Sequence, residues 1–84
     1  MSRLTGKERR EQLLDVAEKA FARHGYARAT TAELAKAAGV TEPIIYRHFD
    51  SKRALFIALI QRTAQRTLGY WEQQLATAHG KLLS

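Results

Sequence analysis

The 84-residue sequence contains no cysteine, one proline and no apolar run long enough to cross a bilayer. Without cysteine, disulfides and thiolate metal ligands are excluded, and the redox compartment stays open. A membrane-spanning helix needs about 20 consecutive apolar residues, and the sequence has no such stretch. The N-terminus is polar and charged, unlike a secretory signal peptide. These absences favour a cytoplasmic protein.

Residues that carry chemistry are also sparse. His24, His48 and His79 are scattered, and none has metal-ligand spacing to another histidine or an acid. The five glycines are isolated and form no phosphate-binding loop. We therefore expect no enzymatic activity, no catalytic residue, no metal and no cofactor.

Acidic residues are few relative to basic ones. The chain has 14 Lys and Arg against 8 Asp and Glu, a formal charge of +6. Such an excess favours an anionic partner, which is a nucleic acid or, less often, an anionic membrane surface. The length suits one small domain with a modest core.

The apolar pattern is helical and contains no convincing strand. Residues 1–6 are expected to form a flexible arm, followed by a helix over residues 7–24 that ends before Gly25. One apolar stripe follows this helix, and acids toward its start suit the helix dipole. The stripe consists of Leu13, Leu14, Ala17, Ala20 and Phe21, and the acids are Glu8, Glu11, Asp15 and Glu18.

A helix-turn-helix is predicted over residues 30–52. Thr30 and Glu33 have the spacing of a capping box for a short helix that buries Leu34, Ala35 and Ala38. Gly39 supplies the left-handed conformation of a sharp turn, and Val40 fills the corner.

A second short helix follows over residue 42 to about residue 48. Thr41 caps it, and Pro43 lies in its first turn, where no backbone N–H is missed. Phe49 is expected in the core. Ser51 then caps a further helix whose first residue is Lys52.

The last helix is predicted over residues 52–79, with Gly80 as its stop. Leu55, Phe56 and Leu59 should pack on the first three helices. A second stripe has nothing in the chain to cover it, so residues 7–59 are assigned to the domain and 60–84 to a helical extension toward a missing domain. That stripe consists of Ile57, Ile60, Ala64, Leu68, Trp71 and Leu75.

Together these elements predict an all-α fold: a three-helix bundle with a helix-turn-helix and the start of a long fourth helix. Many spaced positions resemble the DNA-binding domain of TetR (tetracycline-repressor) family regulators. The resemblance covers roughly residues 8–59. It rests on Leu14, Ala17, Phe21, Gly25, Tyr26, Thr30, Leu34, Ala35, Ala38, Gly39, Val40, Thr41, Ile45, Tyr46, Phe49, Ser51, Lys52 and Leu55.

In a helix-turn-helix, the second helix enters the major groove with its N-terminal residues against the base edges. This places Thr41, Glu42, Pro43 and Ile44 nearest the bases. The family commonly has glycine and threonine at the last two positions, so this sequence departs from it there. Because Ile45 already supplies a core residue, Ile44 is expected to face outward, where it suits a thymine methyl; core packing is the alternative. Glu42 either accepts from cytosine N4 or serves the helix dipole.

The other candidates contact phosphates. Lys52 opposes the dipole at the start of its own helix, a conflict that a phosphate would resolve. The resemblance implies phosphate contacts for Thr30, Tyr46 and His48, with core packing as the alternative for Tyr46 and solvation for His48. Thr31 is a further phosphate candidate, and Arg47 grips phosphate or reads guanine. The predicted DNA-binding residues are Thr30, Thr31, Thr41, Glu42, Pro43, Ile44, Tyr46, Arg47, His48 and Lys52.

The resemblance implies a transcriptional repressor that binds a double-stranded DNA operator as a homodimer. It also implies release by a small-molecule ligand bound in a C-terminal domain that this chain lacks. A different interpretation is a basic amphipathic protein whose exposed stripe binds a partner protein or an anionic membrane. The acids interleaved along the first helix and the concentration of base-facing residues after Gly39 argue against this interpretation.

Overall fold

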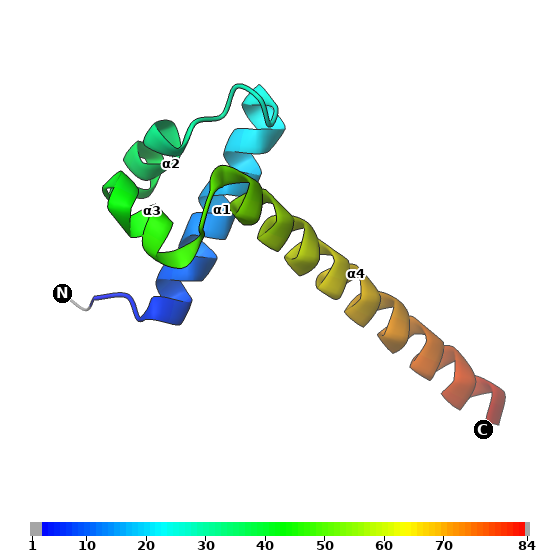
Figure 1. Ribbon diagram of the computed structural model, residues 1–84. Helices are drawn as coiled ribbons and strands as arrows, with labels where there is room; N and C mark the ends of the chain where they lie inside the picture. The colour runs from blue at the N-terminus through cyan, green and yellow to red at the C-terminus, as the bar shows by residue number, and fades with distance from the viewer. Residues whose placement is uncertain (1–2, 84) are drawn as a thin grey trace.

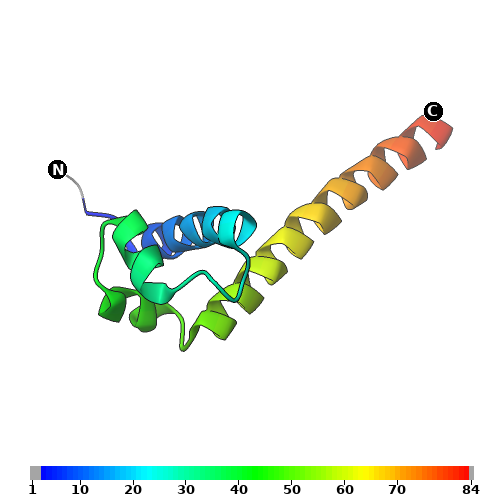
Figure 2. The ribbon, with the colours of Figure 1, turned by 90° about the horizontal axis from the view of Figure 1, so that it is seen from above.

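The computed structural model describes residues 3–83, with the backbone alone for residues 79–83, and within this range contains four helices and no strand. They are α1 (Gly6–His24), α2 (Thr31–Ala38), α3 (Glu42–His48) and α4 (Lys52–Leu83). The first three helices and the start of α4 form a bundle, from which the rest of α4 projects as a single rod (Figures 1 and 2). The predicted all-α architecture is confirmed, and the predicted bounds of α1 and α3 agree with the structure to within one residue.

The core collects the apolar stripes of all four helices. Partly buried Val40 and Phe56 pack against it, so the predicted roles of these two residues are confirmed. Phe49 is buried as expected. The buried apolar side chains are Leu13, Leu14, Ala17, Phe21, Ala29, Leu34, Ala35, Ala38, Ile45, Phe49, Leu55, Ala58 and Leu59.

Glycine conformation ends two of the helices. Gly39 has φ 71° and ψ 30°, the left-handed conformation predicted for the turn between α2 and α3, and Gly25 has φ 82° after α1. The predicted stop at Gly80 is wrong, because α4 continues to Leu83. Glycine permits a left-handed turn without imposing one, and a helical glycine costs only about 1 kcal/mol relative to alanine.

Helix caps differ in detail from the prediction. The reciprocal capping box occurs at Thr5 and Glu8, where each side chain accepts from the other residue's backbone N–H, at 3.0 and 3.1 Å. The bond from the Thr5 N–H lowers the pKa of the Glu8 carboxyl. At α2 only half of the predicted box forms, with Thr30 Oγ1 accepting from the Glu33 N–H at 3.1 Å. Thr41 occupies the cap position of α3, but its hydroxyl makes no capping bond.

Ser51 caps α4 as predicted, since its Oγ accepts from the Ala54 N–H at 3.0 Å. The first helix begins at Gly6 with Thr5 as its cap. Thr5 and Gly6, which were predicted to belong to the arm of residues 1–6, therefore belong to the helix start. Residues 1 and 2 of that arm lie outside the described part of the chain.

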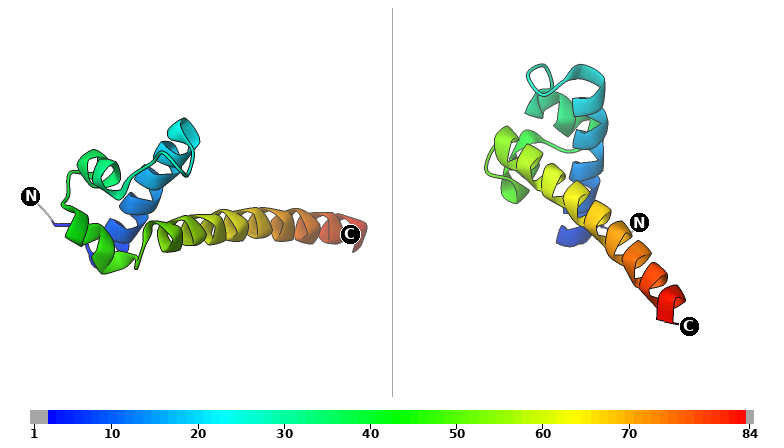
Figure 3. Two further views of the ribbon diagram at one scale, coloured as in Figure 1. Left: turned by 45° about the horizontal axis from the view of Figure 1, so that its top comes forward. Right: turned by 90° about the vertical axis from the view of Figure 1, so that its right-hand side faces the viewer.

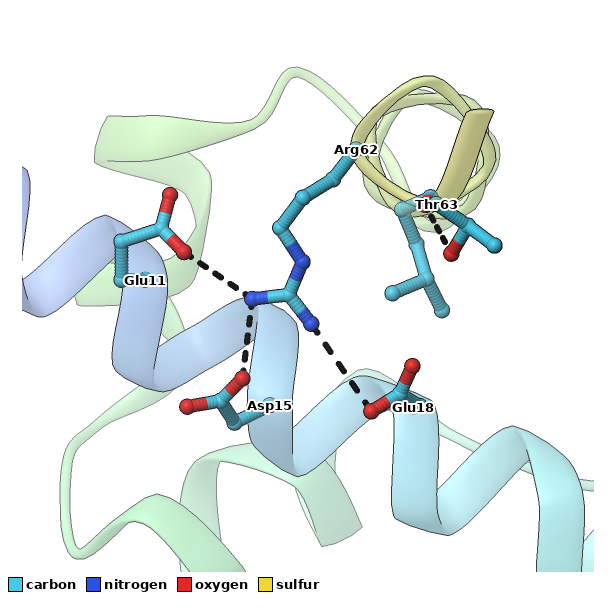
Figure 4. A network of polar contacts seen from close by, with 6 residues as sticks. Glu11, Asp15, Glu18, Arg62 and Thr63 are labelled. Atoms are coloured by element: carbon cyan, nitrogen blue, oxygen red, sulfur yellow. Dashed lines mark hydrogen bonds and ion pairs between the residues drawn. The ribbon is translucent and has the colours of Figure 1, made fainter. Parts of the chain in front are cut away.

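A buried arginine joins α4 to α1. Arg62 is 8% exposed, and its Nη1 lies 3.0 Å from Glu11 Oε2 and 2.8 Å from Asp15 Oδ1, while Nη2 lies 3.9 Å from Glu18 Oε1 (Figure 4). Burial alone would lower the pKa of the guanidinium, but its bonds to Glu11 and Asp15 outweigh this and raise it. From the sequence, Glu11, Asp15 and Glu18 are expected only to interact favourably with the helix dipole. In the structure, all three lie near the guanidinium of Arg62.

Beyond Arg62, no part of the chain that the structure describes covers α4. Every described side chain from Thr63 to Ala78 is exposed, including the predicted stripe at Leu68, Trp71 and Leu75. The left view of Figure 3 shows this part of the helix clear of the bundle. None of the described helices is both long and apolar enough to span a membrane.

Candidate nucleic-acid interface

The helix-turn-helix places the N-terminus of α2 beside α3. Both helices lie at the end of the molecule away from the far end of α4 (Figure 1). Leu34, Ala35 and Ile45 face the core, so the opposite faces of the two helices point away from it. The exposed candidates are Thr30, Thr41, Glu42, Pro43, Tyr46 and Arg47, and the half-buried ones are Thr31, Ile44, His48 and Lys52.

Three of these candidates are joined by hydrogen bonds between α2 and α3. Thr31 Oγ1 donates to Glu42 Oε2 at 2.9 Å and lies 3.1 Å from Tyr46 Oη. Tyr46 is 47% exposed, so the alternative of a core tyrosine is wrong. No pattern in the sequence indicates this contact, because it depends on how two helices cross.

Ile44 and His48 lie at the edge of the same surface. Ile45 is fully buried, whereas Ile44 is half-buried and lies outside the core cluster. This agrees with the expected outward position of Ile44. The ring of His48 lies 6.5 Å from that of Phe49, and no described contact ties His48 to Thr31, Glu42 or Tyr46.

Lys52 serves the link between α1 and α2. Its Nζ donates to the carbonyl oxygens of Tyr26 at 2.6 Å and Ala29 at 3.0 Å, and lies 4.2 Å from the centre of the Tyr26 ring. These carbonyls account for a lysine at a helix start without any phosphate, which removes the argument that led to the phosphate prediction. An ammonium group has three N–H donors, so one stays available for a phosphate. The phosphate contact itself stays a prediction.

We expect Lys52→Met to lower the free energy of unfolding by about 1–2 kcal/mol, because two charge-assisted hydrogen bonds to the link are lost. Arg53→Met is the matched control, since Arg53 is the next residue, is exposed and makes no described polar contact outside its helix. Urea unfolding followed by circular dichroism measures both. Equal losses in the two variants would mean that Lys52 does not hold the link.

The candidate surface carries a charged side chain that faces solvent. Exposed Arg47 forms no ion pair within the described residues, so its charge faces solvent. Among the residues that the structure describes, no group of three or more His, Asp or Glu could hold a metal ion. The side chain of His79, which is expected near a helix end, lies outside the described residues.

Known relatives share this part of the chain. The HTH-type transcriptional activator FasR of Mycolicibacterium smegmatis is 41% identical to this chain over 76 residues, which cover 90% of this chain and 35% of that protein. The nucleoid occlusion factor SlmA of Actinobacillus pleuropneumoniae is 44% identical over 71 residues, covering 83% of this chain and 35% of that protein. The HTH-type transcriptional regulator TtgR of Pseudomonas putida is 46% identical over 54 residues, covering 64% of this chain and 26% of that protein.

A solved structure has the same fold. The fatty acid degradation regulator FadR from Bacillus halodurans superposes with a TM-score of 0.75 at 33% identity, over 87% of this chain and 38% of that one. The chain thus spans about a third of the length of the relatives it matches. The family model for bacterial regulatory proteins of the tetR family matches residues 13–59, which hold most of α1, all of α2 and α3, and the start of α4. The chain therefore belongs to the TetR family of bacterial regulatory proteins.

Proposed function

We propose that this chain binds double-stranded DNA sequence-specifically, as the DNA-reading part of a transcriptional regulator. The observation that carries the proposal is the shared surface of α3 and the α2 N-terminus, where exposed polar side chains lie on helices whose other faces are buried in the core. An α-helix fits the major groove of B-DNA, and a helix N-terminus suits a phosphate. The net charge of +6 favours the same anionic partner.

Roles follow from position on that surface. Thr41, Glu42, Pro43 and Ile44 stand at the start of α3, the part of a recognition helix that meets base edges. There, Ile44 suits a thymine methyl. The backbone contacts are proposed for Thr30, Thr31, Tyr46, Arg47, His48 and Lys52.

For the whole protein we propose a cytoplasmic homodimer on a pseudo-palindromic operator, with two copies of α3 about 34 Å apart in successive major grooves. Release by a small-molecule ligand and action as a repressor are proposed with it; a relative described as a transcriptional repressor supports the latter, while FasR is described as an activator. The alternative of membrane or partner binding through the α4 stripe is not favoured, because the family match covers the helix-turn-helix and ends at residue 59.

The test compares two arginines that differ only in location. Arg47→Gln on α3 should weaken binding of a labelled duplex about five- to tenfold, because a contact to phosphate or guanine is lost. Arg66→Gln, an equal change of charge at an exposed position on α4, should stay within about twofold. Fluorescence anisotropy between about 50 and 200 mM salt measures both affinities.

The pattern of loss identifies the contact. A uniform loss on all duplexes, with a salt slope lower by about 1, assigns Arg47 to phosphate. A loss confined to one position of a sequence selected from a random library assigns it to guanine. Equal losses for Arg47→Gln and Arg66→Gln would overturn the proposed interface.

A further inference from the structure

The hydrogen-bonded group of Thr31, Glu42 and Tyr46 belongs to the proposed DNA surface. Thr31 Oγ1 is 2.9 Å from Glu42 Oε2 and 3.1 Å from Tyr46 Oη. Glu42 opens α3, Tyr46 stands one helical turn later, and Thr31 opens α2. The group therefore connects the base-reading end of α3 with two residues proposed to hold phosphates.

The available protons fix the direction of these hydrogen bonds. An ionised carboxylate only accepts, and each hydroxyl carries a single proton. The Thr31 proton is used on Glu42, so the Tyr46 hydroxyl must donate to Thr31 Oγ1. A phosphate oxygen also only accepts. With Glu42 in this position, neither hydroxyl has a proton to offer a phosphate, and the carboxylate adds a repelling charge beside it.

We infer that Glu42 is a specificity-determining residue that makes the phosphate contact of Tyr46 depend on the base that α3 meets. This inference rests on the proposed function. Cytosine N4 presents a donor in the major groove, and a carboxylate that turns to it exchanges one hydrogen bond for another. Thr31 is then free to donate to Tyr46, and Tyr46 to donate to a phosphate.

Adenine, whose N6 also carries a donor, can release the group as cytosine does, but base edges that present only acceptors cannot. Guanine presents N7 and O6, and thymine presents O4, all of them acceptors that a carboxylate cannot bind. On such sequences Glu42 continues to accept the hydrogen bond from Thr31, and the Tyr46 hydroxyl continues to donate to Thr31. The negative charge of Glu42 then faces the DNA backbone. Glu42 therefore favours the correct site mainly by penalising the others.

The experiment measures how much the Tyr46 hydroxyl contributes to DNA affinity when Glu42 is present and when it is replaced. Affinities are measured by anisotropy at one salt concentration on a library-selected duplex and on an unrelated duplex of equal length. In the unaltered chain, Tyr46→Phe should lower the affinity for the selected duplex about fivefold and change the affinity for the unrelated duplex less than about twofold. In the Glu42→Ala background, Tyr46→Phe should weaken both duplexes about fivefold, because the hydroxyl is free on either.

Glu42→Ala alone should raise affinity for the unrelated duplex about five- to tenfold and so reduce the specificity ratio. Glu42→Gln removes the charge but keeps an acceptor for Thr31, so it should raise that affinity less than Glu42→Ala does. Glu72→Ala, an equal change of net charge at an exposed position on α4, is the control and should have little effect. Circular dichroism confirms that each variant is folded.

The inference is overturned if Tyr46→Phe has the same effect on the unrelated duplex with and without Glu42. It is also overturned if Glu42→Ala raises both affinities equally, or no more than Glu72→Ala does. Failure of the unaltered chain to bind either duplex would contradict the proposed function itself, a result that the first two outcomes do not produce.

Discussion

Leu55→Ala is expected to abolish most of the stability of the domain, whereas Leu68→Ala on the same helix leaves it nearly unchanged. Leu55 is 0% exposed and lies among the core side chains of the bundle, while Leu68 is 59% exposed. Truncating a buried leucine costs about 2–5 kcal/mol, since apolar contact is lost and a cavity remains. Truncating the exposed one should change stability by no more than about 0.5 kcal/mol.

Such a loss is severe for a chain of this length. Domains of this size bury a smaller fraction of their surface on folding than larger domains do, and they have little stability in reserve. Leu55→Ala should therefore unfold the bundle at moderate temperature and remove the proposed DNA binding with it. Urea titration followed by circular dichroism gives both free energies. Comparable losses at Leu55 and Leu68 would mean that α4 is packed along its full length, contrary to its exposed stripe.

The core was predictable because burial follows the helical period. Leu13, Leu14, Ala17 and Phe21 recur at intervals of three and four and lie on one buried face. Gly39 was predictable for a different reason, since a sharp turn between two short helices needs a left-handed residue. In both cases the controlling interaction is local, and the sequence alone contains it.

Contacts between helices were harder to predict from the sequence. Arg62 lies 51 and 47 residues from Glu11 and Asp15 in the chain, so no local pattern pairs them. One signal was present: Glu11, Asp15 and Glu18 have spacings of four and three, which puts three negative charges on one helix face. Like charges so placed call for a cation from elsewhere. The pattern does not say which of fourteen basic residues supplies it.

The candidate interface divides in the same way. The sequence placed Glu42 and Tyr46 correctly on one short helix, because cap and turn residues set its bounds. It did not place Thr31 between them, since that contact depends on the packing of α2 against α3. For Lys52 the sequence indicated a charge in an unfavourable position, and the structure supplies carbonyl oxygens rather than an anion as its partners.

Removing the acids around Arg62 is expected to cost more than removing Arg62 itself. In the triple variant Glu11→Gln, Asp15→Asn, Glu18→Gln, a guanidinium that is 8% exposed keeps its charge and loses every carboxylate near it. An uncompensated buried charge costs about 3–5 kcal/mol. We expect about 3 kcal/mol here, because the three carboxylates are half-exposed and water can reach the vacated positions.

Arg62→Met reverses the situation. Methionine keeps an unbranched apolar side chain between α4 and α1 and brings no charge into the interface. The three acids are already close to solvent and regain water without a large penalty. Nε and Nη2 of Arg62 have no hydrogen-bond partner among the described residues, so the native arrangement itself is incompletely satisfied. We therefore expect Arg62→Met to cost about 1 kcal/mol or less.

The decisive comparison combines both changes. Adding Arg62→Met to the triple variant should restore about 2 kcal/mol, because the charge that lacked a partner is gone. Urea unfolding of the four chains gives this coupling free energy directly. A different result would be that Arg62→Met alone lowers the free energy of unfolding as much as the triple change does, and that adding it to the triple variant restores no stability. In that case the attraction between Arg62 and the acids outweighs the desolvation of the guanidinium. The junction of α4 with α1 would then be held by charge rather than by the packing of Leu55 and Leu59 beside it.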